Sequence, residues 1–468
     1  MFAKVKDIIG KLVSKIFRKE TVQQKLNVDV AVSDDMVKGI ELWSKMYENK
    51  SPWISNTIKS MNLASSIAGE LARLTTIEFE SEITGNDYLN EQYKTVLEKL
   101  REQVEYGCAN GGLIFKPYVN GENIEVDFVQ ADGFYPTSYN SRKEITGAIF
   151  TEFKQVGKKL YTRLEYHNLT DEGYYISNTA YMKESYSINV KAGNDLGNQV
   201  SLKDIDSWSE LEEEVLIKNI DKPLFSYFRI PLANHIDKSC PLGVSVYARV
   251  IDDIQEADKH YSRILWEYEG SELSVDVDIG AFKRNKDDEL ILPDGKERLY
   301  RTLDYGDETK WNVFSPEIRD TSLFNGLNKL LRNIEFKCGL AYGTISDVSE
   351  NDKTATEIKS SKQRSYSTVK DIQKSLEKSL IDLAYVMDVW AKLANLPSSK
   401  YEISFNWDDS LVMTKEEELQ SMANDVASGL LRAEIYLAKK YGVSEEEALK
   451  MMPQTTTVTK SPFDDMEE

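Results

Sequence analysis

The chain begins with a helical pattern of apolar and basic positions. Between Met1 and Glu20, apolar residues recur every three or four positions, and basic residues fill most of the opposite face. The apolar face consists of Phe2, Val5, Ile8, Ile9, Leu12, Val13, Ile16 and Phe17. The pattern predicts a basic amphipathic helix. Such a helix can lie on a membrane surface or bind a partner, and packing on its own protein or on a neighbouring copy is an equal alternative.

Helical patterns continue as far as a glycine pair. Ser33 and Asn86 are good N-caps for two of the expected helices, and Asn110-Gly111-Gly112 is a typical C-terminal stop. The expected helices span residues 34–49, 54–75 and 87–106.

The period then changes from helical to alternating. Two β-rich segments are joined at Asn120-Gly121, which is a strong hairpin signal. The expected strands span residues 113–119, 123–129, 148–153, 161–167 and 173–182. Residues 194–209 are polar and contain glycine, and they predict an exposed loop. Helices followed by an antiparallel meander make residues 1–240 an α+β region.

The helical period returns at Leu242 and continues to about Gly270. A compact insertion, Leu273–Phe314, follows, with strands expected over 275–282 and 289–292 and a turn at Pro293-Asp294-Gly295. Ser315-Pro316-Glu317 then supplies a cap, a first-turn proline and an acidic first turn for another helix, which stops near Gly339.

A polar loop, residues 342–353, separates that helix from the longest helical segment. Residues 354–395 contain no glycine or proline and predict one helix about 60 Å long. Its first half is polar, and its second half has an apolar core face. Beyond it we expect a strand over 401–407, two helices over 415–430 and 433–452, and an acidic, disordered tail from Pro453.

Composition limits the possible functions. The 468 residues carry a formal net charge of -20, which argues against a protein that grips nucleic acid over a broad basic surface. Cys108, Cys240 and Cys338 are widely spaced and odd in number, so they predict buried free thiols in a reducing compartment. No apolar segment is long enough to cross a bilayer, and no signal peptide is recognisable, so we expect a cytosolic protein.

Motifs for catalysis or metal binding were not found. The chain lacks a phosphate-binding glycine loop, a nucleophile elbow and the usual metal-ligand spacings. His235 lies five residues before Cys240, but a structural histidine near a buried thiol is the better interpretation. The acidic groups Asp252-Asp253, Asp287-Asp288-Glu289 and Asp408-Asp409 are better explained as solvated surface than as cation sites. We therefore expect no enzyme activity, no cofactor and no metal.

Basic residues cluster in the insertion. Acidic residues are interleaved with them, and this mixture suits a protein–protein surface better than a DNA clamp. The cluster consists of Lys283, Arg284, Lys286, Lys296, Arg298 and Arg301.

The order of these parts resembles that of bacteriophage portal proteins, in particular those of long-tailed phages of Gram-positive hosts. Short segments carry the same resemblance, which covers nearly the whole chain. They are Glu70-Leu71-Ala72-Arg73-Leu74, Gly339-Leu340-Ala341-Tyr342-Gly343, Lys353-Thr354-Ala355-Thr356-Glu357-Ile358 and Ile403-Ser404-Phe405-Asn406-Trp407.

The resemblance implies an assignment for each part of the chain. Residues 1–240 correspond to an α+β wing, 241–271 and 315–340 to a two-helix stem, and 272–314 to a β-rich clip. Residues 341–353 correspond to a tunnel loop, 354–409 to a long helix and wing strand, 410–455 to a helical crown and 456–468 to an acidic tail. The N-terminal basic helix corresponds to no known part, and the resemblance does not lead us to expect the long barrel extension of some portals.

The resemblance also implies partners and a location. Copies of the chain would form a ring, a homododecamer, at one capsid vertex of the virion, after assembly in the host cytoplasm. The clip residues named above would dock the terminase large subunit and later a head-completion adaptor protein, and the ring would contact the major capsid or scaffold protein. Double-stranded DNA would pass the tunnel loop, whose DNA-facing residues would be Ser346, Asp347, Ser349, Glu350, Asn351 and Lys353.

Other functional classes stay open on the sequence alone. The main alternative is a minor capsid or head-assembly protein without a channel, and a hydrolase that uses acidic residues is a residual one. For residues 342–353, the alternative is an ordinary helix connection on the outer surface.

Overall fold

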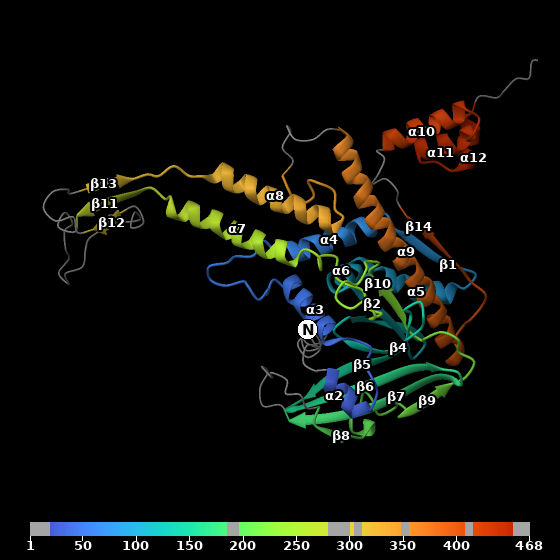
Figure 1. The fold of residues 1–468 in the computed structure, drawn as a ribbon. Helices are drawn as coiled ribbons and strands as arrows, with labels where there is room; N and C mark the ends of the chain where they lie inside the picture. Colours follow the sequence, from blue (N-terminus) through green and yellow to red (C-terminus); the bar gives the residue numbers. More distant parts are fainter. Residues whose placement is uncertain are drawn as a thin grey trace, which may run out of the picture. The chain divides into compact units, whose positions relative to one another are not determined.

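The computed structural model describes residues 19–184, 196–278, 300–303, 311–347, 355–407 and 415–452. The chain divides into two compact units, Met1–Asn406 and Trp407–Glu468 (Figure 1). The helix expected over residues 1–20 lies outside the described residues except for its end, where α2 (Lys19–Leu26) begins. The strand expected over 289–292, the turn at Pro293-Asp294-Gly295 and the tail also lie outside them.

Two of the expected helix caps are confirmed. The Ser33 hydroxyl accepts a hydrogen bond from the backbone N–H of Met36 at the start of α3 (Asp34–Tyr47). Asn86 does the same for α5 (Asp87–Leu97). The helix expected to continue to Tyr106 is broken, however, and α6 (Leu100–Asn110) follows as a separate helix that ends at the left-handed Gly111. The break lets α5 pack on β1 while α6 packs on α4 and β2.

The helix expected over 54–75 is shorter than predicted. Only α4 (Leu63–Thr75) is helical. The preceding segment is held in an irregular conformation by the buried Asp258, whose carboxylate accepts from the Trp53 indole and the Met61 backbone N–H, both at 2.8 Å. These tertiary hydrogen bonds replace the local ones that a helix would form.

Two antiparallel sheets lie between Gly112 and Arg229. The hairpin at Asn120-Gly121 is confirmed, and β10 extends it to a three-stranded sheet of order β10-β2-β3. The predicted meander is also confirmed, in a six-stranded sheet of order β4-β5-β6-β7-β8 with β9 paired to β7. The strands are β2 (Gly112–Asn120), β3 (Asn123–Gln130), β4 (Phe134–Tyr139), β5 (Ile145–Val156), β6 (Lys159–Thr170), β7 (Gly173–Glu184), β8 (Asn198–Val200), β9 (Glu214–Ile217) and β10 (Ser226–Arg229).

The prediction of an exposed loop over 194–209 is wrong for its described part. After β8, the turn η1 (Leu202–Asp204) begins a short cover over the sheet. Leu202, Ile205 and Trp208 are buried and pack with Ala180 of β7. The three apolar side chains recur every third residue, so a largely polar segment still has one face that packs on the sheet.

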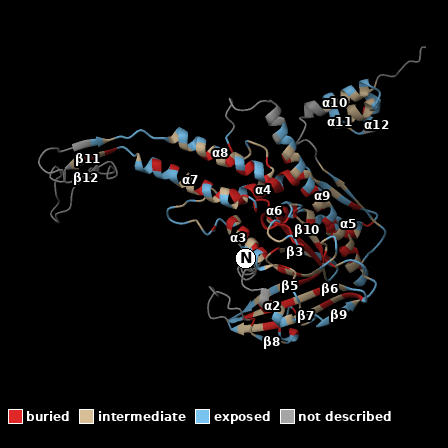
Figure 2. Ribbon diagram, viewed as in Figure 1, coloured by how far each residue is buried: buried red, intermediate tan, exposed pale blue. Residues whose placement is uncertain are grey.

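The long helix and the late strand are confirmed. α9 (Ala355–Leu393) packs on β10, β2 and α4, and β14 (Glu402–Asn406) pairs with β1 (Glu80–Thr84). Figure 2 shows buried positions concentrated where α9 crosses these elements. Most of the core face predicted for its second half is buried, and Trp390 at its end is partly buried. The buried residues are Val369, Ile372, Leu376, Leu380, Leu383 and Met387.

Two helices flank the insertion. They are α7 (Ile251–Gly270) and α8 (Asp320–Cys338), and the insertion forms a sheet of order β12-β11-β13 from β11 (Ser274–Asp278), β12 (Tyr300–Leu303) and β13 (Trp311–Phe314). The helix expected from Leu242 begins later, because residues 242–250 fill the core instead. Tyr247 is fully buried, and its hydroxyl donates to the Trp43 carbonyl at 2.9 Å.

The second unit is helical. It contains α10 (Lys415–Ala427), α11 (Ala433–Tyr441) and α12 (Glu445–Met451). The last predicted helix is divided because the left-handed Gly442 ends α11 and Ser444 caps α12. Leu430 is 81% exposed, so this small unit leaves large apolar side chains uncovered.

Candidate functional site

The antiparallel helices α7 and α8 carry the small sheet of the insertion at their far end (Figure 1). Ile254, Ala257 and Ile264 of α7 are buried, as are Leu327, Leu331 and Ile334 of α8. The two apolar stripes therefore pack on each other, as the sequence predicts for a two-helix stem. We refer to α7 and α8 as the stem pair.

Three sets of polar contacts, spaced along the helices, join α7 to α8, and the first two are as follows. Asp253 accepts from Lys337 at 2.7 Å and from Asn333 at 3.0 Å. The His260 Nε2 atom lies 2.8 Å from the Leu323 carbonyl oxygen, so this nitrogen carries the proton and donates. Polar contacts spaced along both helices favour a stiff pair.

The third set of polar contacts, between Glu267 and Arg319, explains why α8 begins later than predicted. Glu267 of α7 receives two hydrogen bonds from the Arg319 guanidinium, at 2.9 and 2.7 Å, and one from the Arg319 backbone N–H at 3.4 Å. The hydrogen bond from Arg319 holds the pKa of Glu267 below its ordinary value. The start expected at Ser315-Pro316-Glu317 is therefore wrong, because Arg319 is fixed to α7 in the position preceding the helix.

The stem pair also has large apolar side chains that the single chain leaves uncovered. Trp266 is 68% exposed. Other exposed side chains on α7, on α8 or at their junction with the insertion are Leu265, Tyr268, Leu273, Val313, Ile318, Phe324 and Phe336. Apolar exposure on this scale is typical of a surface that another protein covers.

The predicted clip residues lie almost entirely outside the described part of the chain. Lys283, Arg284, Lys286, Lys296 and Arg298 are outside it, and Arg301 belongs to β12. The backbone pairing of the insertion is defined: β11 runs parallel to β12 and antiparallel to β13.

The loop after α8 is firmly attached where the structure describes it. Gly339 has the left-handed φ of 74° that ends the helix, and Leu340 is fully buried. Glu335, also fully buried, accepts hydrogen bonds from the backbone N–H groups of Ile345 and Ser346 and from the Ser346 hydroxyl.

Of the residues expected to face DNA, two are described. Ser346 is buried and its hydroxyl is bound to Glu335, so its role in the chain is to anchor the loop. We therefore correct its assignment as a DNA-facing residue. Asp347 is exposed. Ser349, Glu350, Asn351 and Lys353 lie outside the described residues.

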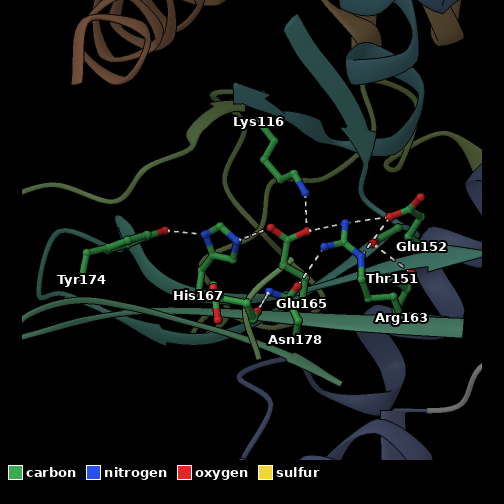
Figure 3. Close-up of polar contacts among 10 residues, drawn as sticks. Lys116, Thr151, Glu152, Arg163, Glu165, His167, Tyr174 and Asn178 are labelled. Carbon is green, nitrogen blue, oxygen red and sulfur yellow. Dashed lines mark hydrogen bonds and ion pairs between the residues drawn. The ribbon is translucent and has the colours of Figure 1, made fainter. Parts of the chain in front are cut away.

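A buried charged network on the six-stranded sheet, shown in Figure 3, was missed in the sequence analysis. The Glu165 carboxylate on β6 lies 2.5 Å from Lys116, 3.1 Å from Arg163 and 2.7 Å from the His167 Nε2 atom. The Lys116, Arg163 and Glu165 side chains are 10, 11 and 13% exposed. Alternation places Arg163, Glu165 and His167 on one face of β6, but only the fold shows that this face is buried.

Charge states within the network follow from burial and pairing. Burial alone raises the pKa of Glu165, but Lys116, Arg163 and His167 outweigh burial and hold the pKa well below its ordinary value. Burial lowers the pKa of His167 despite the neighbouring carboxylate. His167 is therefore neutral near pH 7. Its Nε2–H donates to Glu165, and its Nδ1 accepts from the Tyr174 hydroxyl at 2.9 Å.

The Cys/His pair considered from the sequence does not form a reactive centre. Cys240 is buried, burial raises the pKa of its thiol to about 11, and His235 is exposed. All three cysteines are free and buried, as predicted. Within the described residues, no three His, Cys, Asp or Glu side chains gather in an arrangement that can hold a metal ion, and no helix has the length and apolarity needed to span a membrane.

Comparison with protein families gives a match to "Phage portal protein, SPP1 Gp6-like" over residues 40–458. The chain belongs to this phage portal family. The match includes the two sheets between Gly112 and Arg229, the stem pair, the insertion and the long helix. Portal proteins of this family are structural components, and membership implies a place in the phage particle.

Other comparisons add less. Among solved structures, the chain is similar to one described as "Neck of native GTA particle computed with C12 symmetry", with 11% identity and a TM-score of 0.42. That alignment covers 90% of this chain and 97% of the other. No curated protein matches the chain. The α+β fold of a portal subunit follows from the family match and the helices and sheets described above.

Proposed function

We propose that copies of this chain form a ring-shaped channel at one vertex of the phage capsid, through which double-stranded DNA is packed and later ejected. Membership of the portal family over residues 40–458 is the observation that carries this proposal. The ring is a homododecamer that assembles in the host cytoplasm and remains in the virion. The protein has no catalytic role in this account, so a separate terminase motor supplies the packaging energy.

The stem pair supplies the ring contacts in this proposal. A closed ring needs a heterologous interface, in which two different faces of each copy meet. The exposed Trp266 and its apolar neighbours are suited to that contact, because a neighbouring stem pair can cover them.

Two segments of the chain have proposed partners. The insertion docks the terminase large subunit during packaging and a head-completion adaptor afterwards, through the basic residues from Lys283 to Arg301. The N-terminal basic segment binds a protein partner or the capsid interior, and the ring contacts the major capsid or scaffold protein. Mixed charge in the insertion suits partners that exchange at one surface.

The channel lets double-stranded DNA pass without binding it tightly. A net charge of -20 in each copy is multiplied around the ring, and negative surface repels phosphate. The loop after α8, including the exposed Asp347, then touches the passing duplex weakly, because strong binding needs several phosphate-neutralising cations.

Native mass spectrometry of the purified full chain tests the assembly. We expect ring-sized oligomers for the natural sequence and mainly monomers for Trp266→Glu, which places a charge in the proposed interface. Val156→Glu, at a 52% exposed position in the wing, is the matched control and should still form rings. Monomers of the natural chain under all salt conditions would contradict the proposal and favour a head protein without a channel.

A further inference from the structure

The backbone that leaves α8 turns back along the helix. Leu340 is buried next to the helix end, and Ile345 and Ser346 bind Glu335. Asp347 then lies beside Asn328, which is ten residues before the last helical residue, or about 15 Å along the axis. The loop therefore leaves the stem pair from the middle of α8.

One polar stripe of α8 holds this backbone in place. Asn328, Arg332 and Glu335 are spaced by four and three residues, so they lie on one face of the helix. Asn328 accepts from the Asp347 N–H at 2.7 Å and donates to the Asp347 carbonyl at 3.2 Å, and Arg332 donates to the same carbonyl at 3.4 Å.

Glu335 makes the strongest part of this attachment. Its carboxylate accepts from the Ile345 N–H at 2.7 Å, the Ser346 N–H at 2.9 Å and the Ser346 hydroxyl at 2.7 Å. Hydrogen bonds to a charged acceptor are stronger than neutral ones. A fully buried carboxylate without these donors would be very unfavourable, so the loop and the helix stabilise each other's position.

A second contact holds the other side of the loop. The Arg364 guanidinium of α9 lies 4.5 Å from the centre of the Phe336 ring on α8 and 5.2 Å from the Tyr342 ring. The beginning of the loop is thus held between α8 and α9, and its position cannot shift along α8 without breaking contacts on both helices.

We propose that Asn328, Arg332 and Glu335 form a clamp that positions the loop, by setting the point along the stem pair from which it reaches passing DNA. The role of the clamp in presenting the loop to DNA rests on the proposed function. The hydrogen bonds that define the clamp do not depend on it. The three clamp residues are positioning residues: they act through the backbone of residues 345–347 and do not touch the duplex.

Hydrogen exchange on the purified full chain tests the clamp independently of DNA. Glu335→Ala should speed exchange at the Ile345 and Ser346 amides by roughly tenfold or more, because both lose their acceptor. Glu335→Gln keeps one acceptor oxygen and should restore most of the protection. Glu317→Ala removes an exposed carboxylate just before α8 and is the control for charge. Unchanged exchange in Glu335→Ala would overturn the clamp.

DNA retention in assembled particles tests what the clamp does. We expect Glu335→Ala rings to form normally while particles lose packaged DNA faster than those with the natural chain or Glu335→Gln. Faster exchange with unchanged retention would overturn the positioning role. Failure of the natural chain to form rings would instead contradict the proposed function and leave the exchange result standing.

A milder variant distinguishes loss of the clamp from misfolding of the chain. Asn328→Ala removes both side-chain bonds to the Asp347 backbone and leaves the buried Glu335 satisfied. It should speed exchange at the Asp347 amide alone and weaken DNA retention less than Glu335→Ala. No change at Asp347 would overturn the part of the clamp assigned to Asn328.

Discussion

Glu165 is the residue on which the buried charged network of the six-stranded sheet depends. It is the shared partner of Lys116, Arg163 and His167. Glu152, which also pairs with Arg163, has a side chain that is 46% exposed. Removal of Glu165 therefore affects buried cations, whereas removal of Glu152 affects a half-exposed ion pair.

Glu165→Gln should lower the free energy of unfolding by roughly 3 kcal/mol, because the buried Lys116 loses its carboxylate partner and Arg163 keeps only the half-exposed Glu152. Glu152→Gln is the control, with an expected loss below about 1 kcal/mol for a half-exposed pair. Urea unfolding followed by tryptophan fluorescence measures both. Equal losses for the two variants would contradict the central place of Glu165.

His167 should make stability depend on pH in the mildly acidic range. Burial lowers its folded pKa below the ordinary 6.5, so the unfolded chain binds the proton more readily. The stability from neutral His167 is complete above pH 6.5 and is lost as the pH falls towards the folded value. Glu165 loses its contribution only at lower pH, because its folded pKa lies well below 4.5.

The measurement is the urea midpoint at about pH 7.5 and about pH 5.5. The natural chain should lose stability on acidification, and His167→Gln should lose less because the titrating group is absent. His235→Gln replaces an exposed imidazole and should behave as the natural chain. An unchanged slope in His167→Gln would show that another group is responsible.

Elements with strong local signals could be predicted from the sequence, and elements set by distant contacts could not. The Ser33 and Asn86 caps and the Asn120-Gly121 hairpin determine their own conformation. The irregular segment before α4 and the delayed start of α8 depend on Asp258 and Glu267 of α7. Local patterns contain no information about such long-range partners.

The end of α8 provides a test of how closely α9 packs against this helix. A Cβ on Gly339 would lie 2.3 Å from the Thr368 hydroxyl oxygen of α9, and its φ of 74° disfavours other residues. Gly339→Ala should therefore cost about 3 kcal/mol in unfolding free energy, from strain and overpacking together. Gly157→Ala, with a φ of 60° and open space, should cost about 1 kcal/mol. Similar midpoints for both variants would argue against close packing of α9 on α8.

The insertion gives a prediction about docking. Reversing the charge of Lys283, Arg284 and Lys286 together should weaken terminase docking by roughly tenfold or more, because the basic groups steer an acidic partner. Rings should still form, since the stem pair is unchanged. Pull-down of the terminase large subunit by purified rings measures the effect. Undiminished docking would remove these three residues from the role.

For the molecule as a whole, the order of parts was a better guide to function than any site residue. The sequence predicts the α+β region, the stem pair and the long helix, and the family match agrees with the portal class. The resemblance identifies the loop, and the residues expected to face DNA are its polar ones. Polarity could not show that Ser346 is bound to Glu335, because their contact depends on the loop turning back along α8.

Electron microscopy of the purified full chain tests the portal assignment most directly. The account predicts closed rings with a central channel wide enough for duplex DNA, with the stem pairs around the channel and the loop after α8 directed into it. Particles without a central opening, or rings with that loop on the outer circumference, would contradict it.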